Sequence, residues 1–271
     1  KNGGRQYTGH SVDVITDQAL TWLRSRRNKD QPYCLMLHYK SVHGPFYGPK
    51  RYRWMYQNLD LPEPEDLLWS ESPRNKVFEG WPLKIQTNRY LSNQEHYPPP
   101  PLTLKTEDTL KRRQATYQKM VKDYLRAVAG IDDNIGRMMN YVEKAGETNE
   151  TVVIYTSDQG YFLGEHNLFD KRFMLEQSLR MPFIIRYPKE IKSGTTLDDI
   201  ILSIDFAGLM LDYARADIPD YMQGRSFRSN LRGNTPEDWR KSMYYHYWPH
   251  QNRRPSHYGV RTEKYKLIYY Y

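Results

Sequence analysis

The stretch TVVIYTSDQGYFLGEHNLFDKR, residues 151–172, joins an apolar run to a loop that carries acidic, amide, histidine and lysine side chains. The apolar run has the length and the β-branched residues that are typical of a buried strand. In open α/β sheets, functional groups gather beyond the carboxyl ends of the strands. This stretch therefore predicts an α/β fold with a site where its strand ends.

The surrounding segments extend this prediction to a layered α/β domain. Apolar residues recur at helical spacing over residues 11–27 and again, for much longer, from residue 110 to a stop at Gly146. Apolar runs at residues 33–39 and 181–188 predict two further strands. Helix, turn and apolar strand in this order indicate a parallel sheet flanked by helices.

The residue composition and pattern of the chain change at two places. Residues 46–106 are rich in proline and scattered aromatics, and they predict a long irregular excursion. After Gly233, the alternating aromatic runs MYYHYW and HYGVRTEKYKLIYYY predict antiparallel hairpins. The sequence therefore predicts a larger domain over residues 1–232 and the start of a smaller antiparallel subdomain over residues 233–271.

Composition restricts the classes of partner and the location. The 40 Lys and Arg against 32 Asp and Glu give a net charge of +8, which favours anionic partners or indicates simply a basic surface. No apolar run approaches the roughly 20 residues of a membrane helix, and the first ten residues lack the apolar segment of a signal peptide. No nucleic-acid-binding module is recognisable.

The single cysteine, Cys34, lies in an apolar run and is predicted to be a buried, inert thiol.

Four residues in strand-following loops are candidates for chemistry. Asp158 and Gln159 offer hard oxygen donors, which suit calcium or magnesium better than zinc, although an Asp before Gly is also ordinary turn chemistry. Lys171 is a compact cation for an anionic oxygen, with Asp170 to orient it, or else an exposed surface lysine. His43 is a proton donor or anion contact, or a loop histidine without a role.

Several segments together resemble a known family. Residues 151–188 resemble the second half of the catalytic domain of the type I, formylglycine-dependent sulfatases, and are most similar to the branch that acts on sulfated carbohydrates. SVHGPF resembles that family's Pro-His-x-Pro loop, with Val42 where proline is usual, and residues 117–146 resemble its long helix. The resemblance implies an alkaline-phosphatase-like sandwich with a mostly parallel sheet, in which residues 233–271 begin the C-terminal subdomain.

The same resemblance implies roles for individual residues. Asp158 and Gln159 match calcium ligands, Lys171 matches the lysine that grips the sulfate, and His43 matches the histidine near the leaving oxygen. His166 is expected to support these groups, and His257 and Arg261 to contact the sugar. The implied activity is calcium-dependent hydrolysis of sulfate esters on a sulfated carbohydrate. The implied location is periplasmic, extracellular or lysosomal.

The chain departs from the family pattern at the nucleophile. The family makes its formylglycine from the Cys, or Ser, of a Cys-x-Pro-x-Arg motif, and the sequence contains no such motif. Cys34 is followed by Leu-Met-Leu, so it is not that residue. We therefore expect the formylglycine in a preceding portion of the sulfatase, in cis or on another chain, and expect this chain alone to be inactive. Asp132 and Asp133 fall within the predicted long helix and are interpreted as its polar face, not as a metal pair.

Two rival functions remain open at the level of sequence. A phosphatase or phosphodiesterase of the same superfamily commonly holds two zinc ions through Asp and His, and the Asp158–Gln159 pair lacks the imidazole that zinc favours. A non-catalytic polyanion-binding relative would also account for the positive charge and for the missing nucleophile motif.

Overall fold

The chain folds into two compact units that interleave in sequence. The computed structural model describes residues 6–68, 102, 104, 106–249 and 255–271. Of these residues, the first unit comprises 6–68, those between 102 and 147, and Leu163–Phe169, and the second comprises Thr148–Phe162 and those between 170 and 271. The predicted domain boundary at residues 232 and 233 stays a prediction.

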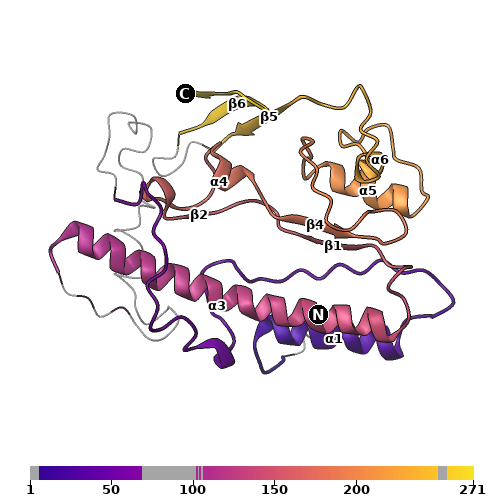
Figure 1. Cartoon of the computed structure of the whole chain (residues 1–271), viewed down its shortest axis with the longest axis horizontal. Helices are drawn as coiled ribbons and strands as arrows, with labels where there is room; N and C mark the ends of the chain where they lie inside the picture. The colour runs from indigo at the N-terminus through magenta and orange to yellow at the C-terminus, as the bar shows by residue number, and fades with distance from the viewer. Residues whose placement is uncertain (1–5, 69–101, 103, 105, 250–254) are drawn as a thin grey trace. The chain divides into compact units, whose positions relative to one another are not determined.

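The first unit is built on two helices, as the sequence predicts. Helix α1 spans Ser11–Ser25 and packs along the much longer α3, which spans Thr109–Lys144 (Figure 1). Both helices present an apolar stripe, and the buried side chains of the two stripes form the core of the unit. These side chains include Val12, Leu20, Leu23, Tyr117, Met120, Ala127 and Ile131. Residues 46–68 are irregular apart from the short helix η1, Lys50–Tyr52, while most of the predicted excursion, 69–101, lies outside the described residues.

Local signals set both ends of α3. The Asp108 carboxylate accepts hydrogen bonds from two backbone amides of the first turn, at 3.0 and 3.2 Å. Gly146 follows the last turn with a φ of +72°, which glycine adopts without strain. Asp132 is exposed, and Asp133 forms an ion pair with Arg51 at 2.7 Å. The prediction that both aspartates lie on the polar face of the helix is therefore confirmed.

The apolar run at residues 33–39 differs from its prediction. Its side chains alternate between half-buried and exposed, but no strand pairing is assigned to it among the described residues. Cys34 is exposed and Met36 is 63% exposed, so the prediction of a buried thiol is wrong for this structure. The reason is that burial of a strand face depends on the layer that covers it, which the run itself does not encode.

The central strands of the second unit pair in the opposite sense to the prediction. Strand β1, Val153–Thr156, pairs antiparallel with β4, Phe183–Arg186, and Thr156 lies opposite Phe183. The connection has no crossover helix, because its only α-helix is the four-residue α4, Glu176–Leu179, whereas a parallel pair needs a crossover to the opposite end of the sheet. Residues 157–182 therefore form a long excursion that leaves from and returns to the same end of these strands.

Two further helices complete the core of the second unit. Helix α5 spans Asp205–Tyr213 and helix α6 spans Arg228–Leu231. Their apolar side chains pack against those of β1 and β4 around a cluster of Leu209, Phe227, Leu231 and Trp239. The core thus supports the strands from which the 157–182 excursion emerges.

The excursion itself contains short elements. Strands β2, Phe162–Leu163, and β3, Phe169–Asp170, pair with each other across the 3-10 turn η5, Glu165–Asn167. This small hairpin precedes Lys171, and α4 follows a few residues later.

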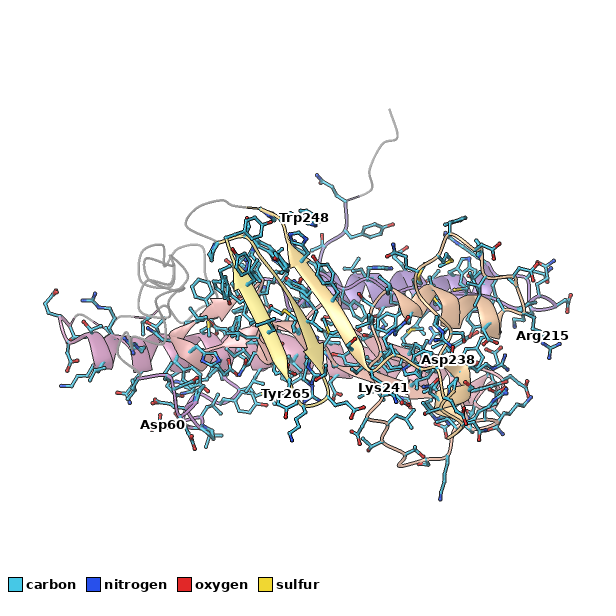
Figure 2. The ribbon with its side chains drawn as sticks, turned by 90° about the horizontal axis from the view of Figure 1, so that it is seen from above. Asp60, Arg215, Asp238, Lys241, Trp248 and Tyr265 are labelled. Atoms are coloured by element: carbon cyan, nitrogen blue, oxygen red, sulfur yellow. The ribbon has the colours of Figure 1, made fainter. Side chains whose placement is uncertain are left out.

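The C-terminal hairpins form the predicted antiparallel sheet. Strands β5, Ser242–Tyr247, β6, His257–Thr262, and β7, Lys266–Tyr270, pair in the order β5-β6-β7. Figure 2 shows the three strands side by side, with Trp248 and Tyr265 at opposite ends of the sheet. The residues alternate between the faces, so that Tyr244 is 61% exposed while the His257 imidazole is buried on the other face.

A helix that spans a membrane requires a certain length and apolarity. Within the part of the chain that the structure describes, no helix is long and apolar enough to span a bilayer.

Candidate active site

The turn after β1 holds the first two candidate residues. The Ser157 hydroxyl donates to the Gln159 carbonyl at 2.7 Å and closes the turn. Asp158 is exposed and Gln159 is half-buried. Among the described residues, neither side chain has a recorded hydrogen bond or ion pair, so their oxygens are available to a cation. This donor set fits a hard metal ion such as calcium, with other ligands completing the shell.

Gly160 fixes this turn against α4. Its backbone N–H donates to the Ser178 carbonyl at 3.0 Å. A Cβ at this position would lie 2.1 Å from the Gln177 carbonyl oxygen and 2.4 Å from that of Arg180. Any other residue would push the backbones apart, so the glycine keeps the Asp158–Gln159 turn in contact with α4.

Lys171 lies between two residues with unusual backbone angles. Asp170 has a φ of +85° and Arg172 a φ of +108°, a region that costs non-glycine residues about 1–3 kcal/mol each. Such angles persist only where surrounding contacts impose them, and they cluster at functional sites. The backbone at Lys171 is therefore held in place by its neighbours.

The lysine itself keeps its charge available. Asp170 pairs with Arg172 and not with Lys171, so the prediction that Asp170 orients the lysine is wrong. Lys171 is half-buried, and within the described part of the chain no ion pair to its ammonium group is recorded. A half-buried lysine without a carboxylate partner is suited to bind an anionic oxygen.

One residue connects the Asp158–Gln159 turn to the lysine segment. Ser178, which is 5% exposed, accepts a hydrogen bond from the Arg172 amide on its hydroxyl at 2.8 Å. Its carbonyl accepts from the Gly160 amide at 3.0 Å. The structure thus ties the backbones next to Asp158–Gln159 and next to Lys171 to the same residue of α4.

His43 lies in the other unit. Its side chain is exposed, and Nδ1 donates to the Gly44 carbonyl at 2.8 Å because a carbonyl can only accept. The neutral ring therefore carries its proton on Nδ1 and presents Nε2 as an acceptor. The convergence of His43 with Lys171 on one anion stays a prediction.

His166 also belongs to the first unit. It has a φ of +56°, and its Nδ1 lies 2.9 Å from Asp66 Oδ2. This contact ties the η5 turn to the irregular segment that precedes residue 69. Its supporting role around the metal stays a prediction.

The two predicted sugar contacts are engaged by the protein itself. His257 is 1% exposed and stacks between Phe173 and Tyr247, with ring centroids at 5.9 and 5.4 Å. Burial lowers the pKa of the His257 imidazole, so the ring is neutral at physiological pH. Arg261 forms two hydrogen bonds to Glu176, at 2.9 and 3.2 Å. These contacts do not support a sugar-binding role for either residue, and that role stays a prediction.

Glu176 is a charged residue that sequence reasoning missed. Burial raises the pKa of its carboxyl, but hydrogen bonds from Arg261 and Lys266 outweigh that effect and lower the pKa to about 2. Glu176 is thus ionised over the physiological range and anchors α4 to the β6–β7 hairpin. Ser178 was also missed, because an isolated serine in a loop-rich segment gives no sequence signal of its contacts.

The elements are those of an α/β protein, and the segments that carry Asp158–Gln159 and Lys171 both form hydrogen bonds with Ser178. The comparisons with known proteins make the class specific. Residues 1–216 match the model of the sulfatase family, and residues 164–271 match the C-terminal model described as N-sulphoglucosamine sulphohydrolase. The chain belongs to the sulfatase family.

Individual relatives agree with this assignment. The chain is 38% identical to the N-acetylglucosamine-6-O-sulfatase of Bacteroides thetaiotaomicron, covering 97% of this chain and 54% of that protein. It superposes with a TM-score of 0.86 and 35% identity on a structure solved with its substrate D-glucosamine-2-N,6-O-disulfate, covering 98% of this chain and 61% of that one. The phosphonate monoester hydrolase of Silicibacter pomeroyi shares the fold, with a TM-score of 0.74, 22% identity, and coverage of 96% of this chain and 52% of that chain.

These relatives confirm the alkaline-phosphatase-like fold predicted for the chain. The chain spans between 52% and 61% of the length of these three relatives.

Proposed function

We propose that the protein containing this chain hydrolyses sulfate esters on carbohydrates, and that its substrate is a 6-O-sulfated glucosamine or N-acetylglucosamine unit. The observation that carries the proposal is that Ser178 accepts hydrogen bonds from Gly160, next to the Asp158–Gln159 turn, and from Arg172, next to Lys171, in a chain of the sulfatase family. The choice of sugar is supported by the relatives that act on this unit.

The chain's residues have separate tasks in this reaction. Asp158 and Gln159 would hold a calcium ion, which would supply positive charge to polarise the sulfate and offset the charge on its oxygens. The Lys171 ammonium binds another oxygen of the sulfate and stabilises the negative charge that shifts during the reaction. Both contributions are electrostatic, and they are strongest where the backbone holds the groups before substrate binds.

His43 would act at the leaving oxygen. Nδ1–H stays with the Gly44 carbonyl, so only Nε2 can exchange a proton with the substrate. In the protonated ring, Nε2–H donates to the sugar oxygen as the ester bond breaks, which is general acid catalysis.

The nucleophile would come from outside these 271 residues. Cys34 is the only cysteine and is followed by Leu35, so it does not fit the Cys-x-Pro-x-Arg motif from which formylglycine is made. We infer that the remaining portion of the sulfatase supplies it, in cis or as another chain, and that this chain alone does not turn over sulfate esters. A periplasmic, extracellular or lysosomal location belongs to the same proposal.

A phosphonate or phosphate ester hydrolase is the second candidate, because one such enzyme shares the fold. The test compares the complete protein and the 271-residue chain on N-acetylglucosamine 6-sulfate, an aryl sulfate and the matching phosphate and phosphonate esters, each with calcium and with chelator. We expect sulfate release by the complete protein only, with loss of activity on chelation. Preference for the phosphorus esters, or comparable turnover by the 271-residue chain, would contradict the proposal.

A further inference from the structure

The segment that follows Lys171 is fixed to the inner face of the C-terminal sheet by contacts of several kinds. The Tyr245 hydroxyl of β5 donates to the Arg172 carbonyl at 2.7 Å. The Phe173 ring stacks on the His257 imidazole of β6, with centroids 5.9 Å apart. These residues all belong to the second unit.

Close packing adds to these contacts at Gly259. A Cβ at this position would lie 2.5 Å from the Met174 sulfur and 2.2 Å from the Leu267 carbonyl. The Met174 side chain is fully buried against this part of the sheet. The Met174 side chain therefore packs directly against the sheet at Gly259.

Arg172 connects these contacts to Lys171, because it is the next residue in the chain. Both of its backbone polar groups are held, the amide by the Ser178 hydroxyl at 2.8 Å and the carbonyl by Tyr245. Its φ of +108° is unfavourable for a residue with a side chain. Without the two hydrogen bonds, the backbone would relax to a common conformation and carry the neighbouring Lys171 with it.

The hydroxyl of Tyr245 is suited to this task. Burial raises the pKa of the Tyr245 phenol, so the group remains a hydrogen-bond donor throughout the physiological range. The ion pairs of Glu176 with Arg261 and Lys266 hold α4, and with it Ser178, to the same sheet. The two partners of Arg172 are thus fixed relative to each other.

We propose that Tyr245 and Ser178 are positioning residues, which set the Lys171 ammonium in place by holding the Arg172 backbone in its left-handed conformation. The C-terminal sheet then contributes to the reaction through the hydrogen bond that Tyr245 donates to Arg172. This inference rests on the proposed function only in assigning the sulfate to Lys171.

Activity of the complete, metal-loaded protein on N-acetylglucosamine 6-sulfate tests the proposal. We expect Tyr245→Phe and Ser178→Ala each to lower kcat/KM by about 10-fold to 100-fold, because small misplacements of a substrate-binding group have effects of this size. Tyr244→Phe is the matched control, since this neighbour lies on the exposed face and its hydroxyl contacts His246, at 3.1 Å. It should change kcat/KM by less than about twofold.

A double-mutant cycle separates positioning from a general loss of structure. In a Lys171→Ala background, Tyr245→Phe should lower kcat/KM by less than about a further twofold, because the group that Tyr245 positions is already absent. An equal loss in both backgrounds, or no loss in the native one, would overturn the proposal. If Lys171→Ala alone leaves kcat/KM unchanged, both the sulfate-binding role of the lysine and its positioning are refuted.

Hydrogen exchange of the peptide that contains Arg172 gives a readout independent of turnover. Exchange should become faster in Tyr245→Phe and Ser178→Ala and stay unchanged in Tyr244→Phe. Should the complete protein release no sulfate, the proposed function fails, whereas unchanged exchange in both variants refutes the positioning role by itself.

Discussion

Replacement of Gly160 by alanine tests whether close backbone contact builds the candidate metal site. The added methyl group would lie 2.1 and 2.4 Å from two carbonyl oxygens at α4, and both are backbone atoms that cannot rotate away. The Asp158–Gln159 turn or α4 must therefore move, and the hydrogen bond from the Gly160 amide to the Ser178 carbonyl is weakened.

The structure sets the size of the effect. Overpacking of this kind costs about 1–3 kcal/mol, and the hydrogen bond contributes about 1 kcal/mol. We expect Gly160→Ala to lower the free energy of unfolding by about 2–4 kcal/mol, which corresponds to a fall in Tm of about 2–7 °C for a protein of this length or longer. Calcium affinity should fall as well, because the two ligands of the turn are displaced.

Thermal unfolding of the complete protein and calcium titration by calorimetry measure both effects. Gly136→Ala is the matched control, because Gly136 is an exposed residue of α3 where an added Cβ would meet no atom within 4 Å. Alanine should raise stability there by about 0.5–1 kcal/mol, since it favours the helix. If Gly160→Ala matches the wild type in Tm and calcium affinity, the reasoning about the turn is wrong.

Three further predictions concern charged residues. Asp158→Asn should weaken calcium binding at least about 10-fold by calorimetry, whereas Asp132→Asn, on the exposed face of α3, should not; equal effects would contradict the metal assignment. The Glu176 carboxyl has a pKa lowered to about 2 in the folded state, so its stabilisation is present above its unfolded pKa of about 4.3 and is lost as the pH falls toward 2. Tm measured across that window should therefore fall less steeply in Glu176→Gln, and identical slopes would refute the ion-pair assignment. Asp123→Ala should lower the free energy of unfolding by about 3–5 kcal/mol in a denaturant titration, because it leaves the buried Arg126 charge without its partner at 2.8 Å, and a cost near zero would count against this pairing.

The sequence by itself determined the elements whose signals are local. The long helix could be predicted because its apolar stripe lies within its own residues and the Gly146 stop follows directly after them. The C-terminal hairpins could be predicted because alternation along a strand needs no knowledge of the partner. The candidate loops at Asp158 and Lys171 were located by the same reasoning, since each follows an identifiable run.

Only the tertiary structure decided which groups these loops contact. The antiparallel pairing of β1 with β4 and the exposure of Cys34 depend on elements distant in sequence. The hydrogen bonds that Arg261 donates to Glu176 depend on such elements as well. Gly160 and Ser178 are small residues whose importance comes from how closely another backbone approaches them. A glycine or serine looks the same in a loose turn as in a tight contact, because the constraint lies in the space around the residue and not in its own chemistry.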